Sequence, residues 1–281
     1  MKTILIPTDF STTALNAAKY ISAMCKKTET ERLILYHSYE IVHPDTILLT
    51  DILEPPPSQL GELENEAIRK LDILKKTLSP LVNDGTVIEY ITNDLPLIEG
   101  IDEIIINEKT DLVTVGISGT ANDGKNVIGS NTLQIMKECK TSLLIVPSAA
   151  TFNGIKQSML AVDLHDIAGT IPVAQLKELL LKLSSKLVVV NVEHHETMGA
   201  DTLMKKETIL HHLLNDLNPE YDYPDNKNKA EGLLMFAEKQ NINLIIVVHR
   251  KYGLVEQLFH RSITKKLAIK TSTPLIILHK N

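Results

Sequence analysis

Short runs of consecutive apolar residues alternate along the chain with longer segments in which apolar residues recur every three or four positions. In the first half the apolar runs are Thr3–Pro7, Leu33–Tyr36, Val87–Ile91, Leu112–Val115 and Leu143–Val146. A continuous apolar run is typical of a strand buried on both faces, whereas the wider spacing is typical of a helix with one buried face. A strand–helix pair repeated four times and closed by a strand predicts a doubly wound, open parallel sheet of five strands.

The helical segments have recognisable ends and inner faces. Ser11 or Thr12 can cap the first helix, Pro80 closes the second, and Ser130 opens the fourth. The proline-rich stretch from Ile41 to Ser58 is interpreted as an irregular loop. The residues expected on the inner faces of the four helices are Ala14, Ala17, Ala18, Ile21, Met24 and Cys25; Leu63, Ala67, Leu71, Leu74 and Leu78; Ile98, Ile101, Ile104 and Ile105; and Leu133, Ile135 and Met136.

The same pattern then occurs a second time. A shift of 154 residues aligns Asp9 with Asp163 and Leu33 with Leu187. A shift of 132 residues aligns the run Leu143–Val146 with Leu275–Leu278. The second copy has therefore lost 22 residues, most of the proline loop and part of the second helix. We interpret the chain as two tandem five-stranded α/β domains, residues 1–147 and 157–281, joined by a linker over residues 148–156.

One loop of the first half has the features of a phosphate site. The strand Leu112–Val115 runs into Gly116 and Gly119, and Gly129-Ser130 opens the next helix. Glycine lets the backbone approach an anion, and the unpaired N–H groups and dipole of a helix N-terminus favour negative charge. Ser130 could cap this helix or donate its hydroxyl to a phosphate oxygen. These glycines could instead serve only the geometry of the turn.

The spacing G-x-x-G-x9-G-S, together with LIPTDFS near the start and DLVTVG before the loop, resembles the universal stress protein family over almost the whole chain. The resemblance implies a Rossmann-like domain of the adenine nucleotide alpha hydrolase type that binds ATP, with or without Mg²⁺. It assigns the ribose contact to Asp9 and the phosphate contacts to Gly116, Gly119, Gly129 and Ser130. It also places Pro7, Thr8, Ser38, Val115 and Asn131 at the nucleotide, although Ser38 and Asn131 depart from a common apolar preference.

The two aspartates that follow the first strand of each half have two interpretations. Either side chain could cap the next helix or contact a ligand. For Asp9 a ribose contact is favoured, because the glycine loop is expected beside it at the carboxyl edge of the sheet. For Asp163 capping is favoured, since Gly116, Gly119 and Gly129 correspond to Val248, Lys251 and Arg261 in the second half, where only Ser262 is retained. We therefore expect no ATP site in the second half.

Two further groups of residues in the second half are candidate sites. His249, Arg250, Lys251, His260 and Arg261 make its loop basic, which suits another anion, an acidic partner surface, or merely a solvated loop. The pairs His194-His195 and His211-His212 lack the spacing of a zinc site, because adjacent helical residues point about 100° apart. We expect no metal site and no catalytic residue.

Composition excludes several classes of protein. The net charge is −6 and no long basic block occurs, which argues against nucleic-acid binding. No apolar run approaches the roughly 20 residues of a membrane helix, and the short apolar N-terminus does not resemble a signal peptide. Cys25 and Cys139 lack C-x-x-C spacing, as expected of reduced thiols in a cytoplasmic protein.

Three classes of function fit the sequence: a nucleotide-binding regulatory protein of the stress response, an enzyme that is a slow ATPase or a nucleotidyl transferase, or a scaffold that binds no nucleotide. A Walker lysine and a nucleophile elbow are both lacking, so any hydrolysis should be weak. Because single-domain relatives commonly pair through their last strand, we expect Leu143–Val146 to pair with Leu275–Leu278 within the chain. The chain should then be a monomer with an internal pseudo-dimer, or a homodimer, and its protein partners stay unknown.

Overall fold

The computed structural model describes residues 1–39, 57–118, 129–164, 171–192, 200–249 and 256–279. Within these residues two five-stranded parallel arrays form one ten-stranded sheet, in the order β3-β2-β1-β4-β5-β10-β9-β6-β7-β8. In the described part of the chain, no helix is both long and apolar enough to cross a bilayer. The strands are β1 Thr3–Pro7, β2 Arg32–Ser38, β3 Val87–Asn93, β4 Leu112–Ile117, β5 Ser142–Pro147, β6 Gln157–Ala161, β7 Lys186–Val190, β8 Glu220–Asp222, β9 Leu244–Val248 and β10 Leu275–Leu278.

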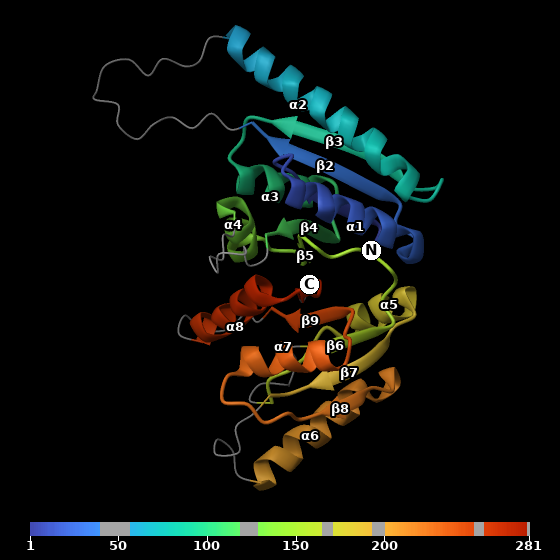
Figure 1. Cartoon of the computed structure of the whole chain (residues 1–281), viewed down its shortest axis with the longest axis vertical. Helices are drawn as coiled ribbons and strands as arrows, with labels where there is room; N and C mark the ends of the chain where they lie inside the picture. The colour runs from blue at the N-terminus through green and yellow to red at the C-terminus, as the bar shows by residue number, and fades with distance from the viewer. Residues whose placement is uncertain (40–56, 119–128, 165–170, 193–199, 250–255, 280–281) are drawn as a thin grey trace, which may run out of the picture.

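The two halves meet through an antiparallel strand pair. Leu275, Ile276 and Ile277 of β10 lie opposite Ile145, Leu144 and Leu143 of β5, whereas the other neighbouring strands of the sheet pair in parallel. This confirms the predicted pairing of the last strands of the repeats. Each apolar edge strand is covered by the other, and the halves are related by pseudo-two-fold symmetry (Figure 1).

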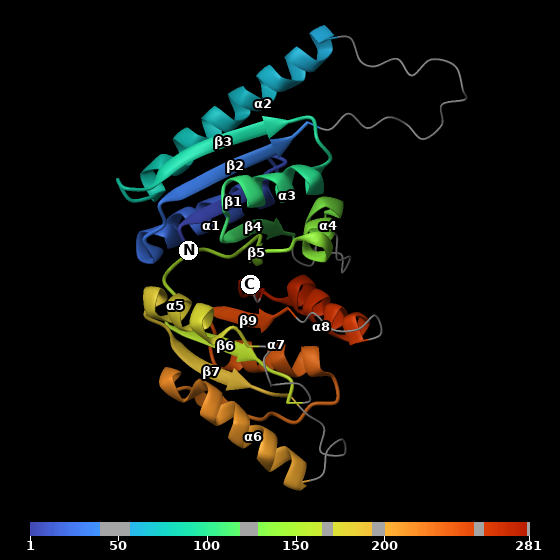
Figure 2. The ribbon, with the colours of Figure 1, turned by 180° about the vertical axis from the view of Figure 1, so that it is seen from behind.

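Helices cover both faces of the sheet, and each layer spans both halves. One core lies beneath α1, α2, α5 and α6, and the other lies beneath α3, α4, α7 and α8 (Figures 1 and 2). The helices are α1 Thr12–Thr28, α2 Pro57–Leu78, α3 Leu97–Asn107, α4 Ser130–Glu138, α5 Val173–Leu183, α6 Ala200–Leu214, α7 Lys229–Lys239 and α8 Glu256–Lys270; 3₁₀ turns at Ser79–Leu81 and Asn215–Leu217 follow α2 and α6.

Local sequence accounts for most element boundaries. Ser11 caps α1 by accepting a hydrogen bond from the Ala14 amide, as predicted. Pro80 lies in the 3₁₀ turn just after α2. The loop expected from Ile41 to Ser58 is shorter, because α2 already begins at Pro57, and residues 41–56 lie outside the described part of the chain. The loss predicted in the second repeat is visible in α6, which has 15 residues against 22 in α2.

Candidate functional site

The turn after β1 is fixed by hydrogen bonds to its own side chains. The Thr8 amide donates to the Tyr36 carbonyl at 2.8 Å, which continues the sheet one residue past β1. Thr8 Oγ1 then accepts from the Phe10 amide, and Asp9 Oδ1 accepts from the Ser11 amide, both at 3.0 Å. Phe10 lies in the left-handed region with a φ of 61°. These short-range bonds fix where Thr8 and Asp9 stand at the carboxyl edge of the sheet.

Asp9 is therefore not the cap of α1, because Ser11 has that role. The Asp9 side chain is exposed, and one carboxylate oxygen holds the turn. No hydrogen bond or ion pair of the described residues engages its other oxygen. A carboxylate with one oxygen fixed and the other facing solvent is well placed to accept hydrogen bonds from ligand hydroxyl groups.

The end of β2 forms the neighbouring wall. His37 Nδ1 lies 2.8 Å from the Thr8 carbonyl oxygen, and the His37 ring packs on Phe10 with centroids 4.5 Å apart. Ser38 Oγ donates to the Leu95 carbonyl at 2.6 Å, which ties β2 to the segment before α3. The Ser38 hydroxyl is thus engaged within the protein, and this accounts for a serine at a position where the family resemblance suggests an apolar residue.

Gly116, in β4, has a packing role that its sequence motif does not reveal. A β-carbon added there would lie 2.3 Å from the Thr13 carbonyl oxygen and 2.7 Å from the Thr13 carbonyl carbon. Only glycine lets the end of β4 pass this close beneath the first turn of α1. The Gly116 carbonyl also accepts a hydrogen bond from Thr132 Oγ1 at 3.0 Å, which fixes α4 to the end of β4. Gly116 therefore positions both helices around the site.

The N-terminus of α4 is exposed and uncapped. Gly129 is the N-cap residue, and within the described residues no side chain caps the first turn. Among the described residues other than its chain neighbours, the nearest atom to a β-carbon added at Gly129 would be Thr132 Oγ1, at 3.9 Å. Ser130 and Asn131 are also exposed in this turn, so capping by Ser130, one of its two predicted roles, is wrong. The first amides of a helix have no intrahelical acceptor and are available to an anion.

The structure brings most of the sequence-predicted positions to one edge. β1 lies between β2 and β4, so Pro7, Thr8, Asp9, Ser38 and Gly116 lie at the carboxyl ends of three adjacent strands. Val115 is buried beneath α3 and α4 as part of the core. Gly129, Ser130 and Asn131 are linked to this edge through Thr132. Gly119 lies outside the described residues.

Three neighbours of this edge were not assigned to the site from sequence: Thr13, His37 and Lys70. The Lys70 ammonium group of α2 lies 5.4 Å from the centroid of the Phe10 ring and pairs with Glu66 at 2.6 Å. Hydrogen bonding to Lys70 lowers the pKa of the Glu66 carboxyl. Because Lys70 is far from Phe10 in sequence, only the packing of α2 over the turn reveals it.

The corresponding edge of the second half is built differently. The predicted capping role of Asp163 is wrong. The next helix, α5, begins only at Val173, and its N-cap residue is Pro172. Asp163 instead lies 3.8 Å from the Lys229 ammonium group of α7. Val248 occupies the end of β9, where β4 has Gly116. A β-branched side chain thus stands where the first half has Gly116, and an aspartate paired with lysine stands where it has the exposed Asp9.

The other groups considered in the second half are only partly visible. His211 packs on Tyr221 with ring centroids 3.8 Å apart, and its Nε2 lies 3.2 Å from the Tyr223 hydroxyl. The His249 ring stacks on the His279 ring, with the ring centroids 4.3 Å apart. Within the described residues, no group of three or more His, Cys, Asp or Glu side chains could hold a metal ion. Arg250, Lys251, His194 and His195 lie outside the described residues, as do the side chains of His260, Arg261 and Ser262.

Comparison with known proteins gives a consistent picture. Residues 1–147 match the model of the universal stress protein family. Universal stress protein MJ0577 of Methanocaldococcus jannaschii is 29% identical over 153 residues, which are 52% of this chain and 94% of that protein. A universal stress protein crystal structure from Archaeoglobus fulgidus superposes with a TM-score of 0.75 at 16% identity, covering 99% of this chain and 98% of that one. The crystal structure of a putative universal stress protein from Pseudomonas aeruginosa superposes with a TM-score of 0.63 at 11% identity, covering 99% of this chain and 93% of that one.

Proposed function

The chain belongs to the universal stress protein family, and from this we propose that its first half binds one adenine nucleotide, ATP, as a regulatory ligand in the stress response. The site is the carboxyl edge where β1, β2 and β4 meet the N-terminus of α4. We further propose that residues 1–147 and 157–281 form two domains, that residues 148–156 link them, and that the second domain binds no ATP.

The residues of this edge suit the parts of a nucleotide. Asp9 offers a carboxylate oxygen to the ribose hydroxyls, and the backbone of Gly129, Ser130 and Asn131 offers amides to the phosphates. The Ser130 hydroxyl can donate to a phosphate oxygen. Pro7, Thr8, Ser38 and Val115 remain proposed neighbours of the adenosine. Bound ATP would bring strong negative charge to a helix terminus whose dipole favours it.

The single observation that carries this proposal is that α4 starts at a glycine N-cap and that no side chain of the described residues caps its first turn. Apart from the chain neighbours of Gly129, no described residue other than Thr132 comes within 4 Å of the place where a Gly129 side chain would stand, and the Thr132–Gly116 hydrogen bond holds that helix end beside β4. A helix that started at this point for stability alone would gain about a few tenths of a kcal/mol from Ser, Asp or Asn in place of glycine at the N-cap position. Glycine sacrifices that bond and leaves the amides accessible to an anion.

Gly129→Asp tests the proposal because it separates folding from binding. Aspartate is a good N-cap and its charge suits the helix dipole, so the variant should be at least as stable as the wild type. The same carboxylate would repel phosphate and occupy its place, so the affinity for ATP should fall by about tenfold or more, which corresponds to about 1.4 kcal/mol. Isothermal titration with ATP gives the affinity, and thermal unfolding without ligand gives the stability.

Gly129→Ser is the matched control, since serine caps the helix without adding charge. It should stabilise the domain like aspartate does but weaken ATP binding much less. Undiminished ATP affinity in Gly129→Asp, with the fold intact, would contradict the proposed site. Failure of the wild type to bind ATP at all would leave the fold explained and the proposed function wrong.

A further inference from the structure

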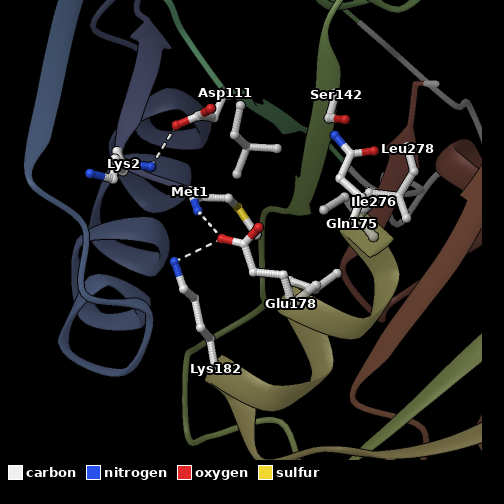
Figure 3. A pocket seen from close by; sticks show the side chains of 11 residues that line it. Met1, Lys2, Asp111, Ser142, Gln175, Glu178, Lys182, Ile276 and Leu278 are labelled. Atoms are coloured by element: carbon white, nitrogen blue, oxygen red, sulfur yellow. Dashed lines mark hydrogen bonds and ion pairs between the residues drawn. The ribbon is translucent and has the colours of Figure 1, made fainter. Parts of the chain in front are cut away.

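A cavity of about 250 Å³ lies at the joint between the halves, on the face covered by α1 and α5. Its walls come from the starts of β1, β4 and β5 in one half and from β10 and α5 in the other (Figure 3). The apolar wall contains Leu112, Leu179, Ile276 and Leu278, and Gln175 of α5 extends toward Ser142. It lies at the amino ends of β1 and β4, the opposite edge from the proposed nucleotide site.

Pseudo-symmetry identifies the counterpart of this cavity. Asp111 accepts hydrogen bonds from the amides of Lys2 and Thr3, as Asn243 does from the amides of Lys156 and Gln157. The helices α1 and α5 both end in a left-handed residue, Glu29 and Ser184, 155 residues apart. The same offset places Gln175 on Tyr20.

On the Tyr20 side the joint is filled by aromatic rings. Tyr20 is 4% exposed and packs edge-to-face on Phe152, with ring centroids 5.4 Å apart. Phe152 belongs to the segment that connects the halves, together with the buried Ala150 and Ile155. The connecting segment passes on the Tyr20 side of the joint. On the other side, Gln175 takes the place of Tyr20, and a cavity lies beside its shorter, non-aromatic side chain.

Gln175 also has an unmet hydrogen-bonding requirement. Its Oε1 atom is buried and has no hydrogen-bond partner among the described residues, a state that is unfavourable for an amide oxygen. The terminal amide rotates readily about its last bond, so it can present its oxygen or its N–H groups to a molecule in the cavity. A ligand here would gain by carrying a group that both donates and accepts a hydrogen bond.

The charged groups of the lining are already partnered, which indicates that the ligand is uncharged. Glu178 is held by Lys182 at 2.9 Å and by the Met1 ammonium group at 3.1 Å, and Asp111 is held by the two amides described above (Figure 3). Drug-sized ligands occupy pockets of about 300–1,000 Å³, so this cavity suits a smaller molecule. We propose that this cavity binds a neutral single-ring aromatic molecule bearing a hydroxyl or N–H group. The bound ring would fill the space that the Tyr20 and Phe152 rings fill on the pseudo-symmetric side of the joint.

Phenol and benzene are the probes, because they differ only in the hydroxyl group that should meet the Gln175 amide. For the full-length wild type, saturation-transfer NMR titration should show one saturable phenol site per chain. Benzene should bind about two- to tenfold more weakly, the range expected for one net hydrogen bond. Absence of saturable phenol binding, or equal affinity for the two probes, would overturn the proposal.

Two substitutions locate the site. Gln175→Tyr puts the Tyr20 side chain into the cavity and should abolish binding of both probes. Gln175→Met keeps an unbranched side chain of similar length and removes the amide, so phenol and benzene should bind it equally. The second variant decides the matter if the first does not fold. Phenol binding that is unchanged in Gln175→Met would place the ligand elsewhere and contradict the inference.

Discussion

At the residue scale, the two described glycines of the nucleotide motif have opposite surroundings. Gly116 lies directly against the backbone of Thr13, whereas the nearest described atom to a β-carbon at Gly129, its chain neighbours aside, is Thr132 Oγ1, at 3.9 Å. The motif spacing predicts that both glycines contact phosphate. The packing against Thr13, however, requires glycine at position 116 whether or not a ligand is bound. The sequence predicted where the glycines lie and could not tell these two reasons apart, because the distinction depends on how α1 crosses β4.

Gly116→Ala should therefore destabilise the protein even without nucleotide. The β-carbon would overlap the Thr13 carbonyl, and backbone atoms can yield only if the helix moves, so we expect a loss of about 1–3 kcal/mol in the free energy of unfolding. Gly61→Ala, inside α2 with no atom within 4 Å, is the control and should stabilise by about 0.5–1 kcal/mol. Urea denaturation measures both; equal stability of Gly116→Ala and wild type would refute the packing role.

The two thiols give a pH-dependent prediction. Burial raises the pKa of Cys25 and of Cys139 from the ordinary value of 9.0 to about 11. Because the fold favours the neutral thiol, their contribution to stability is complete below pH 9.0 and declines as the pH rises toward about 11. At pH 8 the native protein should react very slowly with a thiol reagent such as dithionitrobenzoate, and both cysteines should react after unfolding. Rapid labelling of the native protein would contradict this burial.

At the element scale, apolar runs predicted the strands well. β1 and β10 coincide with Thr3–Pro7 and Leu275–Leu278, because a strand buried on both faces leaves an uninterrupted apolar signature. β2 and β3 extend further than predicted, through polar residues such as Ser38 and Asn93 whose strand pairing the apolar pattern does not record. The capping role predicted for Asp163 is wrong because α5 begins only at Val173, and the apolar pattern does not indicate where this helix starts.

The β5–β10 pair leads to a prediction about the isolated first half. Residues 1–147 alone would expose the β5 edge that β10 covers in the full chain, with Leu143, Leu144 and Ile145 at its centre. An open apolar edge strand favours pairing with another copy, so this fragment should form a dimer or aggregate. Sedimentation velocity distinguishes the states, with the full-length chain at the same concentration as the reference. A stable, well-behaved monomer of the fragment would count against the role of this edge.

At the scale of the whole molecule, duplication has produced similar folds with different edges. The two halves keep the same order of elements, and equivalent hydrogen bonds recur at Asp111 and Asn243. Their carboxyl edges differ, because Asp9 is exposed whereas Asp163 faces Lys229, and Gly116 corresponds to Val248. The loss of the second glycine loop was readable from the sequence. The joint cavity was not, since it depends on Gln175 and Tyr20 meeting different neighbours across the pseudo-two-fold axis.

The stoichiometry of ATP binding to the full-length chain tests this asymmetry most directly. Isothermal titration of the nucleotide-free protein should give one ATP per chain, because within the described residues the first half combines an exposed Asp9 with a glycine N-cap at the start of α4, whereas Asp163 of the second half faces Lys229. Two equivalent sites per chain, or no binding at all, would contradict the account.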